Sequence, residues 1–201
     1  RDGEQAYAFY YPPSNGRAAA HEAAPTLVMV HGGPTAQAKS LYDPMKQFWT
    51  TRGYAVLDVN HRGSTGYGRE FRQSLLGRWG LRDVDDVMDA IEFAVEQGWA
   101  ARERLFVRGK SAGGYAVLRL LTEYGEYFAA GASYYGIGDL AILAEDTHKF
   151  ESHYLDGLLG QKYDPQKATQ PGNPYYDRSP VHTLDKIRCP VIIFQEQIVC
   201  S

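Results

Sequence analysis

A serine with a glycine two residues before it and another two residues after it is the feature of this chain best suited to chemistry. The segment Gly109-Lys-Ser111-Ala-Gly113 follows a short apolar run and precedes a run with helical spacing. This order predicts a strand, a sharp turn with Ser111 at its apex, and then a helix. Such a strained turn leaves no space for side chains at the two flanking positions, which explains the glycines. Ser111 would stand clear of the sheet as a nucleophile at a helix N-terminus, where backbone N–H groups favour developing negative charge.

Two further loops carry residue types suited to the same chemistry. His31-Gly-Gly-Pro34 follows the continuous apolar run Thr26–Val30, and Asn60–Gly68 follows the apolar run Tyr54–Val59. Short apolar runs without alternation are typical of parallel strands that helices cover on both faces. Because the carboxyl ends of parallel strands meet at one edge of the sheet, we expect both loops to lie close to Ser111.

The remaining elements agree with one domain that spans residues 1–201. Strand and helix patterns alternate along the chain, which predicts an α/β fold with a mostly parallel sheet and helices on both faces. The other expected elements are a weak antiparallel strand at Gln5–Tyr11, strands at Ala129–Tyr134 and Pro190–Phe194, and a helix that ends at Gly98 and buries Val84, Val87, Met88, Ile91 and Val95.

Composition narrows the class of partner. The chain has 201 residues, 44% of them hydrophobic, which is enough to bury one sizeable core. A formal net charge of −3 gives no electrostatic reason to expect a nucleic acid or an anionic membrane as partner. No apolar run reaches the roughly 20 residues that span a bilayer. The polar start lacks the apolar centre of a signal peptide, so we expect a cytoplasmic protein.

The sequence predicts neither a metal nor a cofactor. Its two cysteines, Cys189 and Cys200, lack the spacing of metal ligands. Arg104 stands where a phosphate-binding loop ending at Ser111 would need a glycine, and Gly136–Ala141 fits a dinucleotide pattern without the second strand that such a site requires. Four aspartates near the start of the expected helix could suggest a metal site: Asp83, Asp85, Asp86 and Asp89. Favourable charge at a helix N-terminus explains their position better than metal binding does.

Several motifs in order give the chain a specific resemblance. They are His31-Gly-Gly-Pro34, Asn60-His-Arg-Gly-Ser-Thr-Gly-Tyr-Gly68, Asp83-Val-Asp-Asp86, Gly109–Tyr115, and Ser179-Pro180 leading to Cys189-Pro-Val-Ile-Ile-Phe194. The chain resembles the catalytic domain of the prolyl oligopeptidase family of serine peptidases, above all its acylaminoacyl-peptidase and dipeptidyl-peptidase-like branches. The resemblance implies an α/β-hydrolase fold. His61 is a small departure, because many relatives carry Tyr after the Asn.

The resemblance also implies a mechanism and a set of site residues. Ser111 would attack the carbonyl carbon of a peptide and form an acyl-enzyme that water hydrolyses. The backbone N–H groups of Gly33 and Ala112 would form the oxyanion hole. Tyr115 and Phe150 are the expected substrate contacts, the latter in a segment where family members line the pocket for the residue before the scissile bond. Other aromatic residues there are Tyr134, Tyr135 and Tyr154.

The second half of a catalytic triad is the part that the sequence does not supply. In this fold the chain order is Ser, acid, His, with the acid in the loop after the strand at Pro190–Phe194. Here Gln195–Ser201 follows that strand, without a Gly-x-x-Asp loop or a later histidine. Glu196 lies too early, and the three histidines that follow Ser111, namely His148, His153 and His182, precede the acid strand. We therefore expect an inactive, C-terminally truncated fragment without the last strand and helix, and without the family's upstream β-propeller.

Two other functions stay open at this point. A carboxylesterase of the same fold would use the same elbow and oxyanion hole. A non-catalytic binding module is the alternative from a different class, because the triad is incomplete. With no strand after it, Pro190–Phe194 would be an unprotected apolar edge, which predicts self-association.

Overall fold

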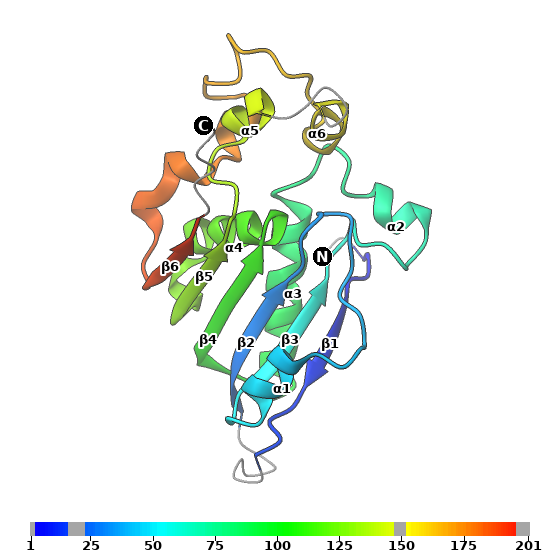
Figure 1. Cartoon of the computed structure of the whole chain (residues 1–201), viewed down its shortest axis with the longest axis vertical. Helices are drawn as coiled ribbons and strands as arrows, with labels where there is room; N and C mark the ends of the chain where they lie inside the picture. The colour runs from blue at the N-terminus through cyan, green and yellow to red at the C-terminus, as the bar shows by residue number, and fades with distance from the viewer. Residues whose placement is uncertain (1–2, 16–22, 147–151, 196–201) are drawn as a thin grey trace, which may run out of the picture.

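A central β-sheet positions the other elements of the molecule. The computed structural model describes residues 3–15, 23–146 and 152–195. Within this part of the chain one six-stranded sheet has the order β1-β3-β2-β4-β5-β6 (Figure 1). β1 is antiparallel to β3, and the other neighbouring strands are parallel. The strands are β1 (Tyr7–Tyr11), β2 (Ala24–Val30), β3 (Ala55–Asn60), β4 (Ala100–Lys110), β5 (Ala130–Tyr134) and β6 (Val191–Phe194).

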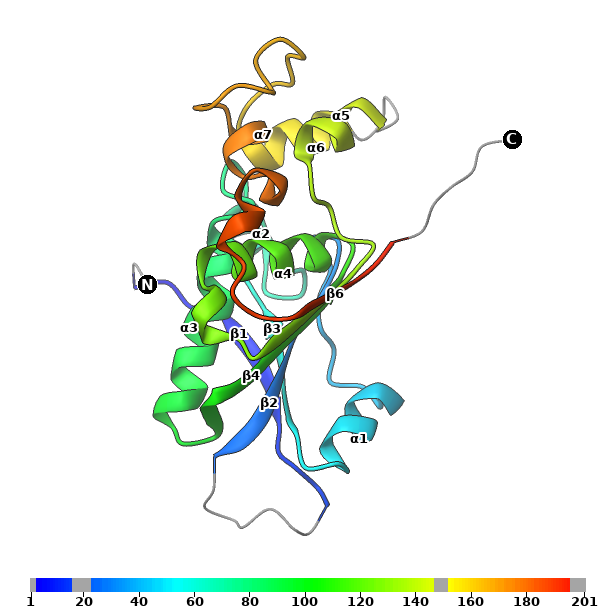
Figure 2. The same cartoon turned by 90° about the vertical axis from the view of Figure 1, so that its left-hand side faces the viewer.

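Helices lie on both faces of this sheet, as the continuous apolar strands predict. α3 (Arg82–Glu96) and α4 (Ala112–Glu123) cover one face, and α1 (Pro44–Thr50) lies on the other (Figure 2). The main core fills the space between the sheet and the α3–α4 layer. All the residues that were expected to form the buried face of α3 take part in this core or pack against it.

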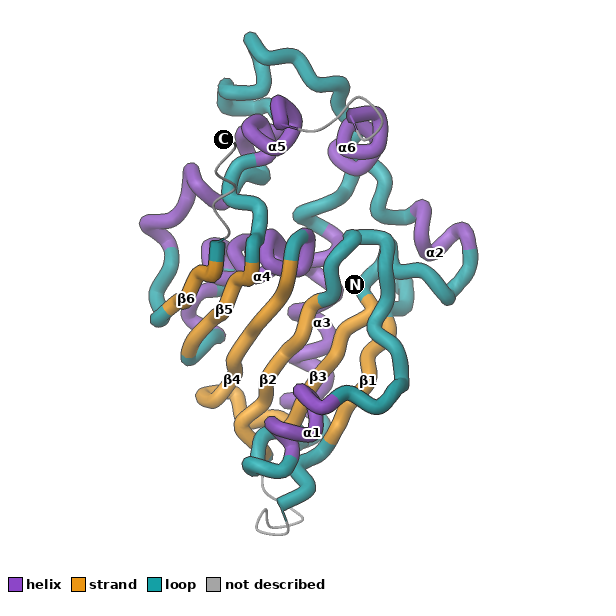
Figure 3. Tube along the Cα trace, viewed as in Figure 1, coloured by secondary structure: helices purple, strands orange, loops and turns teal. Residues whose placement is uncertain are grey.

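A second layer lies above the carboxyl ends of the parallel strands. It contains the short helices α5 (Leu140–Asp146), α6 (Ser152–Leu159) and α7 (Pro174–Asp177), with α2 (Arg69–Gln73) beside it (Figures 2 and 3). Its apolar side chains, Tyr175 among them, pack with Trp79 and with Tyr115 of α4 in a separate buried cluster. The short 3₁₀ helices η1 (Gly125–Tyr127) and η2 (Pro180–Lys186) complete the described elements. None of the helices in the described ranges combines the length and apolar character that crossing a membrane requires.

The aspartates at the start of α3 hold loops as well as favouring the helix terminus. Asp83 is buried and accepts a hydrogen bond from the N–H of Gly80 at 2.7 Å. Asp86 is also buried, and its carboxylate accepts from the backbone N–H of Arg62 at 2.6 Å and pairs with the Arg62 guanidinium at 2.7 Å. The explanation by helix charge alone is therefore incomplete, because Asp86 anchors the loop that follows β3.

We predict that residues 1–201, taken as an isolated polypeptide, self-associate through β6. Within the described residues β6 pairs only with β5, and Ile193 is 53% exposed. Ile193→Lys should reduce association, because a charge on an edge strand opposes pairing with a second chain. Sedimentation velocity over a range of concentrations measures it. Leu184→Lys, which replaces a 46% exposed residue of η2, is the matched control. A chain that stays monomeric at every concentration would contradict the prediction.

Candidate active site

Ser111 occupies the sharp turn that the sequence predicts between β4 and α4. Its backbone has φ 54° and ψ −122°, a strained combination for a residue with a side chain. A Cβ at Gly109 would lie 2.2 Å from the carbonyl oxygen of Gly113. A Cβ at Gly113 would lie 2.2 Å from the carbonyl oxygen of Val30. Both glycines are therefore required by the close approach of backbone to backbone.

The apex of this turn is fixed by its backbone and leaves its side chain free. The N–H of Ser111 donates to the carbonyl oxygen of Tyr134 at 3.0 Å, and the Ser111 carbonyl accepts from the N–H of Tyr115 at 2.9 Å. Ser111 is exposed, and its hydroxyl has no hydrogen-bond partner among the described residues. The hydroxyl is thus presented at the start of α4, at the carboxyl edge of the sheet.

The two backbone N–H groups expected to bind an oxyanion lie beside Ser111. Gly33, Ser111 and Ala112 line one cavity of about 250 Å³. Ala112 is the first residue of α4, so its N–H has no acceptor within the helix. The N–H of Gly33 has no acceptor in the described part of the chain. Ser111 and the two residues expected to supply the donors therefore line the same small cavity.

Apolar side chains form most of the remaining wall of this cavity. They come from the second layer above the sheet and from the loop before α3: Trp79, Ile137, Leu143, Leu155 and Leu158. At the rim, the hydroxyls of Thr35 and Tyr154 are hydrogen-bonded at 2.8 Å, which ties the loop after β2 to α6. A cavity of this size and polarity suits an apolar side chain of a substrate.

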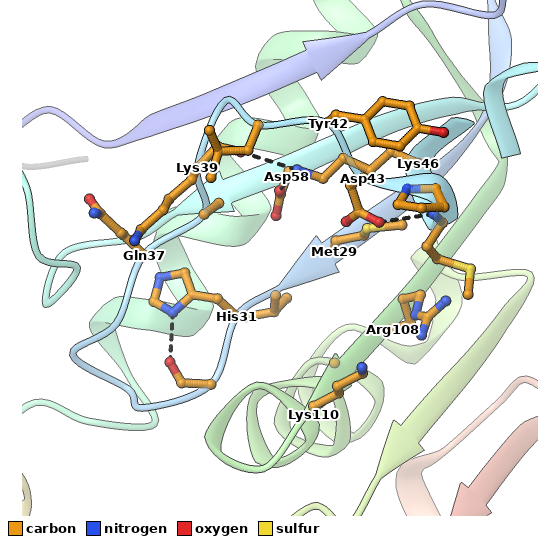
Figure 4. A pocket seen from close by; sticks show the side chains of 17 residues that line it. Met29, His31, Gln37, Lys39, Tyr42, Asp43, Lys46, Asp58, Arg108 and Lys110 are labelled. Atoms are coloured by element: carbon orange, nitrogen blue, oxygen red, sulfur yellow. Dashed lines mark hydrogen bonds and ion pairs between the residues drawn. The ribbon is translucent and has the colours of Figure 1, made fainter. Parts of the chain in front are cut away.

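The loop after β2 is supported from the side away from this cavity. The ring of His31 hydrogen-bonds the carbonyl oxygen of Gly32 at 2.8 Å and the hydroxyl of Ser64 at 2.7 Å. It stacks on the ring of His61 with the ring centroids 4.5 Å apart. Burial, with a smaller contribution from His61, lowers the pKa of His31 to about 4, so the ring is neutral at pH 7. Figure 4 shows His31 at the edge of a second cavity of about 500 Å³ on the α1 side of the sheet.

The last residue of β3, Asn60, supports the same region. The side-chain oxygen of Asn60 accepts from the N–H of Ala38 at 2.7 Å, and its amide nitrogen donates to the Ala38 carbonyl at 3.1 Å. The same nitrogen donates to the Tyr67 hydroxyl at 2.9 Å. Asn60 is fully buried. These bonds join the segments after β2 and β3, as their placement at one sheet edge predicts.

The structure corrects the prediction that Tyr115 contacts the substrate. Its side chain is completely buried, lies against Trp79 with the two rings tilted by 51°, and donates its hydroxyl proton to the carbonyl oxygen of Arg178 at 3.0 Å. Tyr115 follows Ser111 by one turn of α4, and this position directs its ring into the core instead of the cavity. The prediction that it contacts substrate is therefore wrong.

Of the other aromatic and histidine residues named from the sequence, some lie outside the described residues, and the described ones lie either at the cavity or away from it. Phe150 and His148 lie outside the described residues. Tyr154 lines the cavity, whereas Tyr134 stacks on Phe194 in the sheet. None of the described histidines is hydrogen-bonded to Ser111, so this part of the chain shows no general base for the hydroxyl. Within the described ranges no cluster of three or more His, Cys, Asp or Glu side chains could hold a metal ion.

Most of the cavity wall was missed from the sequence. Trp79 belongs to a loop before α3, and the other wall residues belong to the region 137–158, whose helices are short. Short helices give no sustained apolar period from which a face could be assigned. A signal that could have found them is the density of Leu and Ile after β5, at the edge where the site was expected.

We predict that Gly113→Ala destabilises the protein and disables the serine. The new Cβ would meet the Val30 carbonyl oxygen at 2.2 Å, so backbone must shift, at a cost of about 1–3 kcal/mol or more in unfolding free energy. Thermal or denaturant unfolding measures this. Gly138→Ala is the matched control, since a Cβ there meets nothing within 4 Å. Equal unfolding midpoints for the two variants would show that the close approach of Gly113 to the Val30 carbonyl oxygen does not require a glycine at position 113.

Comparisons with known proteins agree with this geometry. A dipeptidyl aminopeptidase BIII from Pseudoxanthomonas mexicana is 36% identical over 172 residues, which cover 85% of this chain and 25% of that protein. Acylamino-acid-releasing enzyme 1 from Oryza sativa subsp. japonica is 30% identical over 171 residues, or 84% of this chain and 22% of that protein. A solved structure of a Mycobacterium tuberculosis puromycin-hydrolyzing peptidase superimposes with a TM-score of 0.86 at 42% identity, covering 94% of this chain and 29% of that one.

These matches define what the chain is similar to and how far the similarity extends. The chain spans about a quarter of the length of the curated relatives it matches. The fold is that of the α/β-hydrolase peptidases, which confirms the predicted fold class. The sequence pattern of the prolyl oligopeptidase family matches residues 41–195, a range that includes the elbow serine and most of the cavity wall. The chain therefore belongs to the prolyl oligopeptidase family.

Proposed function

We propose that this chain contributes the nucleophile, the oxyanion hole and a side-chain pocket to a serine peptidase. The observation that carries the proposal is the shared cavity, which is lined by Ser111, with its unbonded hydroxyl, and by Gly33 and Ala112, the two residues proposed to supply N–H donors. A peptide is the proposed substrate, in keeping with the family and with the relatives named as peptidases. A cytoplasmic location stays a prediction from the sequence.

The geometry supports acyl transfer. The Ser111 oxygen would attack the carbonyl carbon of the substrate, and the carbonyl oxygen would take the negative charge of the tetrahedral intermediate. Donors fixed before the reaction stabilise that charge without reorganising, and the N–H groups of Gly33 and Ala112 are such donors. Collapse of the intermediate would release the amine and leave an acyl-enzyme for water to hydrolyse. The base that takes the Ser111 proton is not among the described histidines.

The apolar wall of the cavity favours a substrate with an apolar side chain next to the scissile bond. Trp79, Leu155 and Leu158 are nearly fully buried and line the cavity next to Ser111. An apolar side chain placed here would hold the neighbouring carbonyl against the hydroxyl and the two donors. We assign the cavity to the residue that precedes the scissile bond.

We predict that Ser111→Ala abolishes peptide hydrolysis in the natural full-length protein. Removal of a nucleophile of this kind lowers kcat by on the order of 10⁶-fold. The measurement is hydrolysis of a chromogenic peptide amide and of the matching ester. Loss of both activities supports acyl transfer at Ser111. Hydrolysis of the ester alone by the wild-type protein would favour a carboxylesterase, and no Ser111-dependent hydrolysis of either would favour a non-catalytic module.

We also predict that Ile137→Phe narrows the range of substrates. The larger side chain would fill part of the cavity of about 250 Å³ and leave less space for a substrate side chain. The value of kcat/KM for substrates with Phe or Leu before the scissile bond should fall by about 10-fold or more, whereas that for Ala should change little. Ile142→Phe, at a 56% exposed position of α5 outside the cavity wall, is the control. A uniform change across all side chains would argue against this pocket assignment.

A further inference from the structure

The position of Trp79 in the cavity wall depends on its main chain. The Trp79 ring is 2% exposed and packs against the ring of Tyr115, with the ring centroids 4.6 Å apart. Its indole N–H is buried and has no hydrogen-bond partner among the described residues. Because apolar packing is non-directional, the bonds that fix the direction of this side chain must lie in the main chain on either side of it.

The main chain around Trp79 is bonded on two sides. Its N–H groups are bonded to α6: that of Gly77 donates to the Gly157 carbonyl at 2.9 Å, and that of Trp79 donates to the Leu158 carbonyl at 3.2 Å. Its carbonyl groups accept from a single side chain, because Arg178 donates to the Gly77 oxygen at 3.1 Å and to the Trp79 oxygen at 3.0 Å. The guanidinium is planar and rigid, so its two bonds hold both peptide units at a fixed spacing.

Arg178 is held in turn by the helix that begins after Ser111. The hydroxyl of Tyr115, in the first turn of α4, donates to the Arg178 carbonyl at 3.0 Å. Arg178 lies between α7 and η2, where the second layer meets α4 (Figure 2): α7 contacts α5, and η2 contacts α4. One residue thus joins the helix of the nucleophile to the loop of Trp79.

The next residue connects a second part of the cavity wall to the same segment. The side-chain oxygen of Ser179, which is fully buried, accepts from the N–H of Leu140 at 2.8 Å. Leu140 is the first residue of α5 and lies in sequence between Ile137 and Leu143, which both line the cavity. Two parts of the wall are therefore bonded to two consecutive residues.

We propose that Arg178 is a positioning residue for substrate specificity: its guanidinium fixes the place of the Trp79 wall, and with it the size of the substrate side chain that the cavity accepts. The inference rests on the proposed function, in which this cavity takes the residue before the scissile bond. Arg178 does not line the cavity, and its effect passes through the main chain of Gly77 and Trp79.

The test uses variants of the natural full-length protein. Arg178→Met removes both donors and keeps an unbranched side chain. Arg178→Lys keeps the charge, but its single nitrogen cannot reproduce the fixed spacing of the two guanidinium donors. Arg188→Met and Arg188→Lys are the matched controls, because Arg188 is exposed between η2 and β6 and its guanidinium also donates to a main-chain carbonyl, that of Asp185, at 2.6 Å.

Each variant is assayed for thermal unfolding and for kcat and KM on peptide amides with Ala, Leu or Phe before the scissile bond. Without Arg178 the N–H bonds of the loop to α6 remain, so we expect the Trp79 wall to shift while the protein stays folded. A difference of one methylene in a pocket changes kcat/KM by about 10- to 200-fold, so the Phe-to-Ala ratio of kcat/KM should fall about 10-fold or more in Arg178→Met. It should fall less in Arg178→Lys and stay unchanged in the Arg188 variants.

Each result decides a different claim. If Ser111→Ala is inactive while folded Arg178→Met keeps the Phe-to-Ala ratio of the wild type, the proposed function stands and the role of Arg178 is refuted. Equal losses for the Ala, Leu and Phe substrates would also refute it, because they would show general support of the fold. If Ser111→Ala still hydrolyses peptides, the proposed function itself is wrong and the inference falls with it. Should Arg178→Met fail to fold, Arg178→Lys carries the test, and an unchanged ratio in that folded variant would overturn the proposal.

Discussion

The site depends on one contact between backbones, where the first turn of α4 rests on the end of β2. No side chain separates them: a Cβ at Gly113 would lie 2.2 Å from the Val30 carbonyl oxygen and 2.7 Å from that of His31. This contact brings the start of α4, with the N–H of Ala112, against the loop that carries the N–H of Gly33. The two donors come from segments far apart in the sequence, and this close approach is what places them around one cavity.

Buried polar groups then hold the loops that surround this contact. Asn60 joins the segments after β2 and β3, and the Arg62–Asp86 pair fastens the loop after β3 to α3. A buried ion pair of this kind contributes little net stability, but removing one partner leaves an uncompensated charge. Its place beside the stacked histidines indicates that its main effect is on the shape of the site.

The sequence predicts the sheet, the elbow and the meeting of three loops because each has a local signature. Continuous apolar runs mark β2 and β3, and the flanking glycines mark Ser111. The cavity wall could not be predicted, because Trp79 and Leu158 meet only through the tertiary packing of short helices. Tyr115 shows the opposite error. It lies next to the elbow in sequence, yet the period of α4 turns it into the core, where its hydroxyl finds the Arg178 carbonyl.

The central claim is that one reacting oxygen is held by both backbone donors beside Ser111. A crystal structure of the natural full-length protein after reaction with an alkyl fluorophosphonate tests it most directly. The account predicts phosphorus bonded to the Ser111 oxygen, with a phosphonyl oxygen about 2.7–3.1 Å from the nitrogens of both Gly33 and Ala112. Phosphorus on a different residue, or a phosphonyl oxygen that neither nitrogen contacts, would contradict it.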